Sequence, residues 1–174
     1  IYMKELSKYI YLYQNKDVLK HINPILNLIK LEYGKSINTK TEKISHTDWH
    51  NQHENRKYVK YFFDNIFKNY AKEFIKFTRQ KGAELDSIWF QHYCKGDYHN
   101  LHTHPKSNFT NVFYLKVGDN QETNIIDCPP INKFNFKIKV GDILTFPAFL
   151  SHESLINTGE DKIVISFHFN LIGH

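Results

Sequence analysis

Cysteine is scarce in this chain of 174 residues, which contains only Cys94 and Cys128. The two lie far apart and form no C-x-x-C pair, so a disulfide framework is not expected and a reducing cytoplasm fits best. Either cysteine has the chemistry of a nucleophile, but a small buried apolar residue is the favoured interpretation of both.

Long apolar runs are also missing. No stretch approaches the ~18 apolar residues that a membrane span requires, and no signal peptide is visible. Hydrophobic residues nevertheless make up 41% of the chain and aromatic residues 16%, which is typical of globular proteins. We therefore expect residues 1–174 to form a single domain with a buried core and no membrane partner.

Arginine is rare although the chain is basic. The net charge is +5, yet Arg56 and Arg79 are the only arginines. Proteins that read bases and phosphates favour arginine because its planar fork binds two acceptors at once. Nucleic acid is therefore kept open as a partner but is not favoured.

The first part of the chain, residues 1–84, reads as a helical front. Apolar residues at helical spacing predict a helix over residues 16–31, broken near Asn23 by Pro24. A second, long amphipathic helix is predicted over residues 56–80, with its aromatic stripe packed on a sheet. The segment between them, residues 36–55, reads as a polar loop.

The remaining part, residues 85–171, changes to a period of two, with short runs separated by turn residues. We expect strands over residues 85–94, 98–104, 108–117, 124–126, 133–140, 142–146, 152–157 and 162–171. About eight short strands at this spacing favour a sandwich or jelly-roll barrel. The fold class is therefore mainly β with N-terminal helices.

Three histidines form a candidate metal site. His102 and His104 are two residues apart, so on a strand both side chains point to the same face. His152, much later in the chain, can complete a three-residue face and leave other coordination positions open for a cosubstrate and oxygen. The alternative is that His102 and His104 are surface or hydrogen-bonding residues near a turn, because the chain holds eleven histidines.

Short motifs in a fixed order surround these histidines. Tyr93-x-x-Gly96 precedes His102, with a second tyrosine at Tyr98. Later elements are Phe113-Tyr114-Leu115, then Gly141-Asp-Ile-Leu-Thr-Phe146-Pro147 ahead of His152, then Lys162 about ten residues after it. In order and spacing these motifs resemble the iron(II)- and 2-oxoglutarate-dependent oxygenases over roughly residues 85–171.

The resemblance is strongest to the prolyl-4-hydroxylase-like branch, and to small phage and bacterial members with a His-Thr-His-Pro motif. It implies a double-stranded β-helix, a jelly-roll or cupin-like barrel, backed by one long and one or two shorter helices. It also implies Fe(II), the cosubstrate 2-oxoglutarate, and O2. The location is then the cytoplasm, or the host cytoplasm for a phage protein.

The resemblance also assigns roles to individual residues. His102, His104 and His152 are the implied metal ligands and catalytic residues. Lys162 is the implied partner of a cosubstrate carboxylate, because a buried carboxylate needs a charged partner. Three further residues are expected to contact the cosubstrate: Tyr114, Ser166 and Tyr93.

The chain departs from the family at one ligand. A carboxylate normally stands where this chain has His104, and Asp97 is the nearest alternative carboxylate, although its position fits a turn better. Among the neighbouring histidines, His99 is expected at the surface, and His92 and His168 are expected to be structural.

The implied reaction is hydroxylation of a peptidyl proline, or of another peptidyl or small substrate, with release of succinate and CO2. One rival is a cupin-like three-histidine metalloenzyme that does not use 2-oxoglutarate. Another is a non-catalytic jelly-roll binding module. The loops at residues 45–52 and 118–132 are expected to frame the mouth, where Trp49 is either a stacking surface or a buried anchor.

Overall fold

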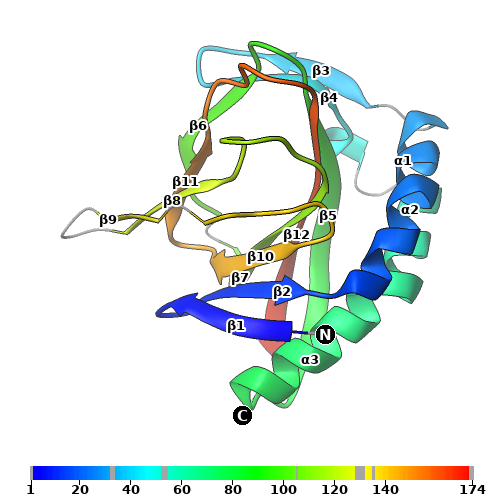
Figure 1. Ribbon diagram of the computed structural model, residues 1–174, viewed down its shortest axis with the longest axis vertical. Coiled ribbons are helices and arrows are strands. Elements are labelled where there is room, and N and C mark those ends of the chain that lie inside the picture. The colour runs from blue at the N-terminus through cyan, green and yellow to red at the C-terminus, as the bar shows by residue number, and fades with distance from the viewer. Residues whose placement is uncertain are drawn as a thin grey trace.

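The main feature of the structure is one curled antiparallel sheet with helices along one side (Figure 1). The computed structural model describes residues 2–31, 34–51, 55–104, 106–127, 132–134 and 136–172. The predicted turn Cys128-Pro-Pro130 lies outside these residues. Among the described helices, none is long and apolar enough to cross a membrane.

Eight strands lie in the part of the chain where eight were predicted. They are β5 (Gly82–Tyr93), β6 (Tyr98–His102), β7 (Phe109–Lys116), β8 (Asn124–Asp127), β9 (Asn132–Phe134), β10 (Ile143–Pro147), β11 (Ser151–Ser154) and β12 (Lys162–Ile172). β9 is shorter than the strand predicted over residues 133–140, because residues 137–140 are not in a strand. The predicted jelly-roll fold class, mainly β with helices on one side, is confirmed.

Four strands in the first part of the chain were not predicted. They are β1 (Tyr2–Ser7), β2 (Ile10–Gln14), β3 (Lys35–Asn38) and β4 (Glu42–Thr47). The prediction of a polar loop over residues 36–55 was therefore wrong, because β3 and β4 form a hairpin and η2 (Trp49–Asn51), a short 3-10 helix, follows it. The hairpin joins the sheet where β4 pairs with both β5 and β6.

The helices follow the predicted spans with two changes. The first prediction corresponds to a 3-10 helix, η1 (Lys16–His21), followed by α1 (Ile22–Leu31). The break thus precedes Pro24, which is tolerated in the first turn of α1 because no helical partner is needed there. The second corresponds to α2 (Lys57–Phe62), the π-helical η3 (Phe63–Phe67) and α3 (Lys68–Thr78) in succession.

The central strands separate two environments by the alternation of their side chains. In β12, Ile163, Ile165 and Phe167 face the helices and join the larger core cluster. Val164, between them, belongs to a second cluster inside the curled sheet. The same strand therefore supplies both the core and the interior in which a site can form.

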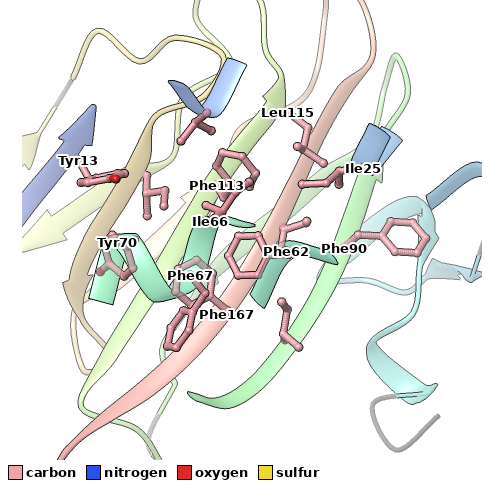
Figure 2. Packing of buried hydrophobic residues seen from close by; sticks show 14 of the residues in the cluster. Tyr13, Ile25, Phe62, Ile66, Phe67, Tyr70, Phe90, Phe113, Leu115 and Phe167 are labelled. Carbon is pink, nitrogen blue, oxygen red and sulfur yellow. The ribbon is translucent and has the colours of Figure 1, made fainter. Parts of the chain in front are cut away.

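Aromatic side chains dominate the core beneath the helices (Figure 2). Phe62 is fully buried, and its ring centroid lies 5.2 Å from that of Phe167 and 5.6 Å from that of Phe113. These contacts join the helices to β12 and β7. The prediction that the aromatic stripe of residues 56–80 packs on a sheet is confirmed except for Phe63 and Phe77, which were assigned to the stripe but are exposed.

Replacing Phe62 should therefore destabilise the fold strongly. Phe62→Ala is expected to lower the free energy of unfolding by about 3–5 kcal/mol, the usual cost of a large cavity in an aromatic core. Phe63→Ala is the matched control, because Phe63 is adjacent but 37% exposed, and it should cost less than about 1 kcal/mol. Urea unfolding measures both, and equal losses would contradict this orientation of the helix.

Candidate metal centre

Three histidines from two strands and the loop after one of them converge inside the curled sheet. His102 on β6 and His152 on β11 are directly opposed in the antiparallel pairing. His104 lies just beyond β6, where its backbone N–H donates to the carbonyl of Ala148 at 2.9 Å. One side-chain nitrogen from each of the three histidines lies within 4.8 Å of the others. The predicted three-histidine cluster is therefore present.

Hydrogen bonds orient two of these rings. Nδ1 of His102 lies 2.7 Å from the carbonyl oxygen of Asn100, and Nδ1 of His152 lies 3.1 Å from that of Leu150. A carbonyl oxygen only accepts, so Nδ1 of each ring is the donor and Nε2 keeps its lone pair. This arrangement is typical of metal-binding histidines, whose second nitrogen is fixed by a hydrogen bond.

Burial keeps the three rings neutral. The pKa of His104 is lowered to about 3, mainly by burial and to a smaller extent by the neighbouring rings of His168 and His102. Burial is also the main reason why the pKa of His102 is lowered and that of His152 is well below its usual value. Neutral imidazole is the form that binds a metal, so the donor set fits a divalent ion at neutral pH.

A narrow inner cavity of about 30 Å³ extends from the histidines to Lys162. The Lys162 side chain is 3% exposed, and its Nζ donates to Oγ of Ser154 at 2.9 Å. Burial lowers the pKa of Lys162 to about 7, against an opposing effect of Glu122. A buried amine that lines a cavity beside other polar side chains is a suitable partner for an anion.

Two other predicted residues line this cavity. Ser166 donates its hydroxyl to Oε1 of Gln91 at 2.9 Å, and the ring of Tyr93 lies 5.2 Å from Nζ of Lys162. Their contacts with a cosubstrate stay predictions. The side chains of Lys162, Ser166, Tyr93 and Gln91 all face the cavity because they alternate with core residues along β12 and β5.

Tyr114 lies behind the cavity wall. Its hydroxyl donates to Oγ1 of Thr123 at 2.8 Å, and Thr123 is the residue that lines the cavity. Burial raises the pKa of the Tyr114 phenol, so the group is a neutral donor. In this arrangement Tyr114 orients the Thr123 hydroxyl, and its own predicted contact with the cosubstrate stays a prediction.

A wider outer cavity of about 370 Å³ lies on the other side of the histidines. The β3–β4 hairpin and η2 form one wall, to which Ile37, Ile44 and Trp49 contribute. Trp49 is 40% exposed, and its ring meets that of Trp89 edge-on at 4.4 Å. The prediction that residues 45–52 frame the mouth is confirmed for Thr47, Trp49 and His50.

Asp97 stabilises a turn, which is the role that its position in the sequence favoured. Its carboxylate accepts from the backbone N–H of Ser45 and of Cys94, each at 2.9 Å, and from the Ser45 hydroxyl at 2.6 Å. Asp97 is also 1% exposed. With its oxygens engaged in this way, Asp97 stabilises the turn between β5 and β6.

Two neighbouring histidines contact the cluster. His99 was expected at the surface, but its ring stacks on His102 at 3.8 Å and its Nε2 lies 3.2 Å from a carboxylate oxygen of Glu42. His168 on β12 places its ring 4.4 Å from His104, with Nδ1 2.9 Å from Oγ of Ser87. His99 and His168 therefore restrict the orientations of the His102 and His104 rings.

Several residues that line the cavities were not predicted from the sequence. Gln91 and Trp89 share the inward face of β5 with Tyr93, and strand alternation alone would have identified them. Ser154 and Thr123 come from β11 and the segment before β8. No sequence pattern marked these two, because their positions depend on the pairing of distant strands.

The comparisons with known proteins agree with this geometry. Residues 87–170 match a family model described as "Putative 2OG-Fe(II) oxygenase". A search of curated protein sequences gives no match.

Solved structures share the fold. A viral collagen prolyl hydroxylase from Paramecium bursaria Chlorella virus-1, solved with 2-oxoglutarate, is 19% identical, with a TM-score of 0.65 over 95% of this chain and 98% of that one. A 2OG-Fe(II) oxygenase family oxidoreductase from Burkholderia pseudomallei is 12% identical, with a TM-score of 0.75 over 94% and 86%. A Pseudomonas putida prolyl-4-hydroxylase is 12% identical, with a TM-score of 0.66 over 95% and 94%.

The family implies Fe(II), 2-oxoglutarate and O2, and the neutral donor set described above suits such an ion. The matched residues contain the three histidines and Lys162. By this match, residues 87–170 are similar to the 2OG-Fe(II) oxygenase family.

Proposed function

We propose that the chain is an Fe(II)- and 2-oxoglutarate-dependent dioxygenase that hydroxylates a peptidyl proline or another peptidyl or small substrate, releasing succinate and CO2. The observation that carries this proposal is a three-histidine cluster between two cavities, the inner one lined by a buried lysine. The inner cavity suits a charged cosubstrate, and the wider outer cavity suits the substrate.

The proposed metal ligands are His102, His104 and His152. Three neutral imidazoles on one face of an ion leave its remaining positions open for the cosubstrate and for O2. Bound iron supplies the oxidising chemistry, coupled to decarboxylation of the cosubstrate. The protein's part is to fix the rings, through Asn100 and Leu150, and to keep the surroundings dry.

The proposed cosubstrate partners are Lys162, Ser166, Tyr93 and Tyr114. In the observed structure Nζ of Lys162 donates to Ser154, so a carboxylate must compete for this donor. The inner cavity of about 30 Å³ has room for about one water molecule. Binding of a five-carbon dicarboxylate therefore requires Lys162 and its neighbours to move apart, and the new charge-assisted bond offsets the cost.

The side chains that line the outer cavity indicate what kind of substrate fits there. Its wall combines aromatic and aliphatic side chains with Glu42 and His50 near the opening. An apolar ring such as that of proline fits beside Trp49 and Trp89. The prolyl hydroxylases among the solved structures with this fold support such a substrate.

Two other functions fit the cluster less well. A cupin-like metalloenzyme without 2-oxoglutarate needs the same histidines but has no use for a buried lysine that lines the cavity. A binding module needs no open coordination position. The burial of Lys162 next to Tyr93 and Ser166 favours the oxygenase over both.

Succinate formation tests the proposal. The protein with Fe(II), 2-oxoglutarate and O2 should release succinate when proline-containing peptides are added. Absence of succinate under all of these conditions, with Fe(II) bound, would favour the cupin-like alternative.

The ligand role of His104 leads to a separate prediction. His104→Ala should weaken Mn(II) binding by more than about 100-fold, since changes outside the first coordination sphere already cost 10–100-fold. His104→Asp should retain most of the affinity, because a carboxylate stands at this position in the family. Anaerobic calorimetric titration measures both, with His50→Ala as the control. Parental affinity in His104→Ala would exclude His104 as a ligand.

Lys162 should determine cosubstrate affinity and leave metal affinity unchanged. Losing a buried charge-assisted pair costs about 2–5 kcal/mol, so Lys162→Met should weaken 2-oxoglutarate binding by at least about tenfold in the Mn(II)-loaded protein. Lys116→Met is the matched control, because the Lys116 side chain is 45% exposed. Equal affinities in the two variants would contradict the assignment.

The lowered pKa of Lys162 predicts a pH dependence. In the free protein this pKa is about 7, so above it the amine must take up a proton when an anion binds. Cosubstrate affinity should therefore be constant below about pH 6 and fall by up to about tenfold per unit above pH 7. Lys162→Arg should show a flatter profile, because arginine stays charged. A flat profile in the parent protein would be inconsistent with a neutral lysine.

A further inference from the structure

A second group of metal-binding side chains lies apart from the three histidines. Nε2 of His92 is 2.9 Å from Oδ2 of Asp161, and Sγ of Cys94 is 3.8 Å from Nε2 of His92. One candidate ligand atom from each of the three residues lies within 4.8 Å of the others. The sequence analysis interpreted Cys94 as a buried apolar residue and His92 as structural, but Cys94 is only half-buried and adjoins a histidine and a carboxylate.

Strand pairing explains why these residues meet. Tyr93 and Lys162 are opposed in the pairing of β5 with β12, and both line the inner cavity. Because side chains alternate along a strand, the residues adjacent to these two, His92, Cys94 and Asp161, point to the other side of the sheet. The second group therefore lies directly behind the part of the inner cavity that Tyr93 and Lys162 line.

A further imidazole lies next to the group on the neighbouring strand. His46 of β4 is directly opposite His92 of β5. The centroids of the two imidazole rings are 5.4 Å apart, and their planes are inclined by 30°. His46 is half-buried, so its ring is next to the group and still within reach of an ion from solvent.

The composition of the group is that of a zinc site. Thiolate, imidazole and carboxylate are the three ligand types that zinc takes in proteins, usually four at a time. One thiolate and one carboxylate balance the charge of a divalent ion. Iron(II) oxygenase sites, in contrast, use imidazole and carboxylate. Sulfur in this group therefore distinguishes it chemically from the three-histidine cluster.

We propose that His92, Cys94 and Asp161 bind one Zn²⁺ ion, with the His46 ring beside the fourth coordination position. The ion joins the end of β5 to the start of β12 from outside the barrel. It thereby fixes the two strand ends that carry Tyr93 and Lys162 into the cavity. Without the ion, the His92–Asp161 hydrogen bond links the two side chains, beside the backbone pairing of Tyr93 with Lys162.

Cobalt(II) is the probe, because a cobalt–thiolate bond gives an intense near-ultraviolet absorption that a three-histidine site lacks. Titration of the reduced protein with Co²⁺ should produce this band, which should saturate by about two ions per chain because the three-histidine cluster also binds Co²⁺, and by about one ion per chain in His102→Ala. Cys94→Ser should lose the band, and Zn²⁺ should displace Co²⁺ and remove it. His102→Ala should keep it, which separates this site from the proposed iron site.

Cys128 provides the matched control, since it is the only other cysteine. Cys128→Ser should retain the cobalt–thiolate band. In the parent protein, Zn²⁺ should slow alkylation of Cys94 by iodoacetamide at least about tenfold, as peptide mapping measures, and this result does not depend on any variant folding. Absence of the band, its loss in Cys128→Ser, or unchanged alkylation of Cys94 would overturn the proposal.

Discussion

The long antiparallel pairing of β5 with β12 is the constraint on which the rest of the structure depends. Residues 82–93 pair with residues 162–172 along the centre of the sheet. Alternation along these two strands directs Phe90 and Phe167 toward the helices and directs Gln91 and Ser166 into the cavity. Core packing thus fixes the register, and the register fixes the site, because a slip of one residue would exchange the two sets.

Much of the site could be predicted because it depends on local spacing. His102 and His104 were expected together from their two-residue spacing, although His104 lies just beyond the end of β6, and Lys162 was expected from its family-like distance to His152. Ser154 and Gln91 could not be found in the same way, since what they touch depends on which strands pair. The position of Tyr114 behind Thr123 likewise follows from a loop whose path no motif encodes.

The fold was predicted best where hydrophobic periodicity was strong. The helices over residues 57–78 and the strands of the second half follow such patterns. β2 was missed because it is a short, continuously buried run without alternation. β1 and β3 were missed because they are at most half-buried and carry no clear alternation. The hairpin of β3 and β4 was read as a loop for the same reason, although it forms one wall of the outer cavity.

The most direct test of the account is a crystal structure of the protein with Mn(II) and 2-oxoglutarate under anaerobic conditions. An anomalous difference peak should lie between the imidazoles of His102, His104 and His152. One carboxylate of 2-oxoglutarate should contact Nζ of Lys162, which no longer donates to Ser154. A manganese peak elsewhere, or a cosubstrate bound away from Lys162, would contradict the account.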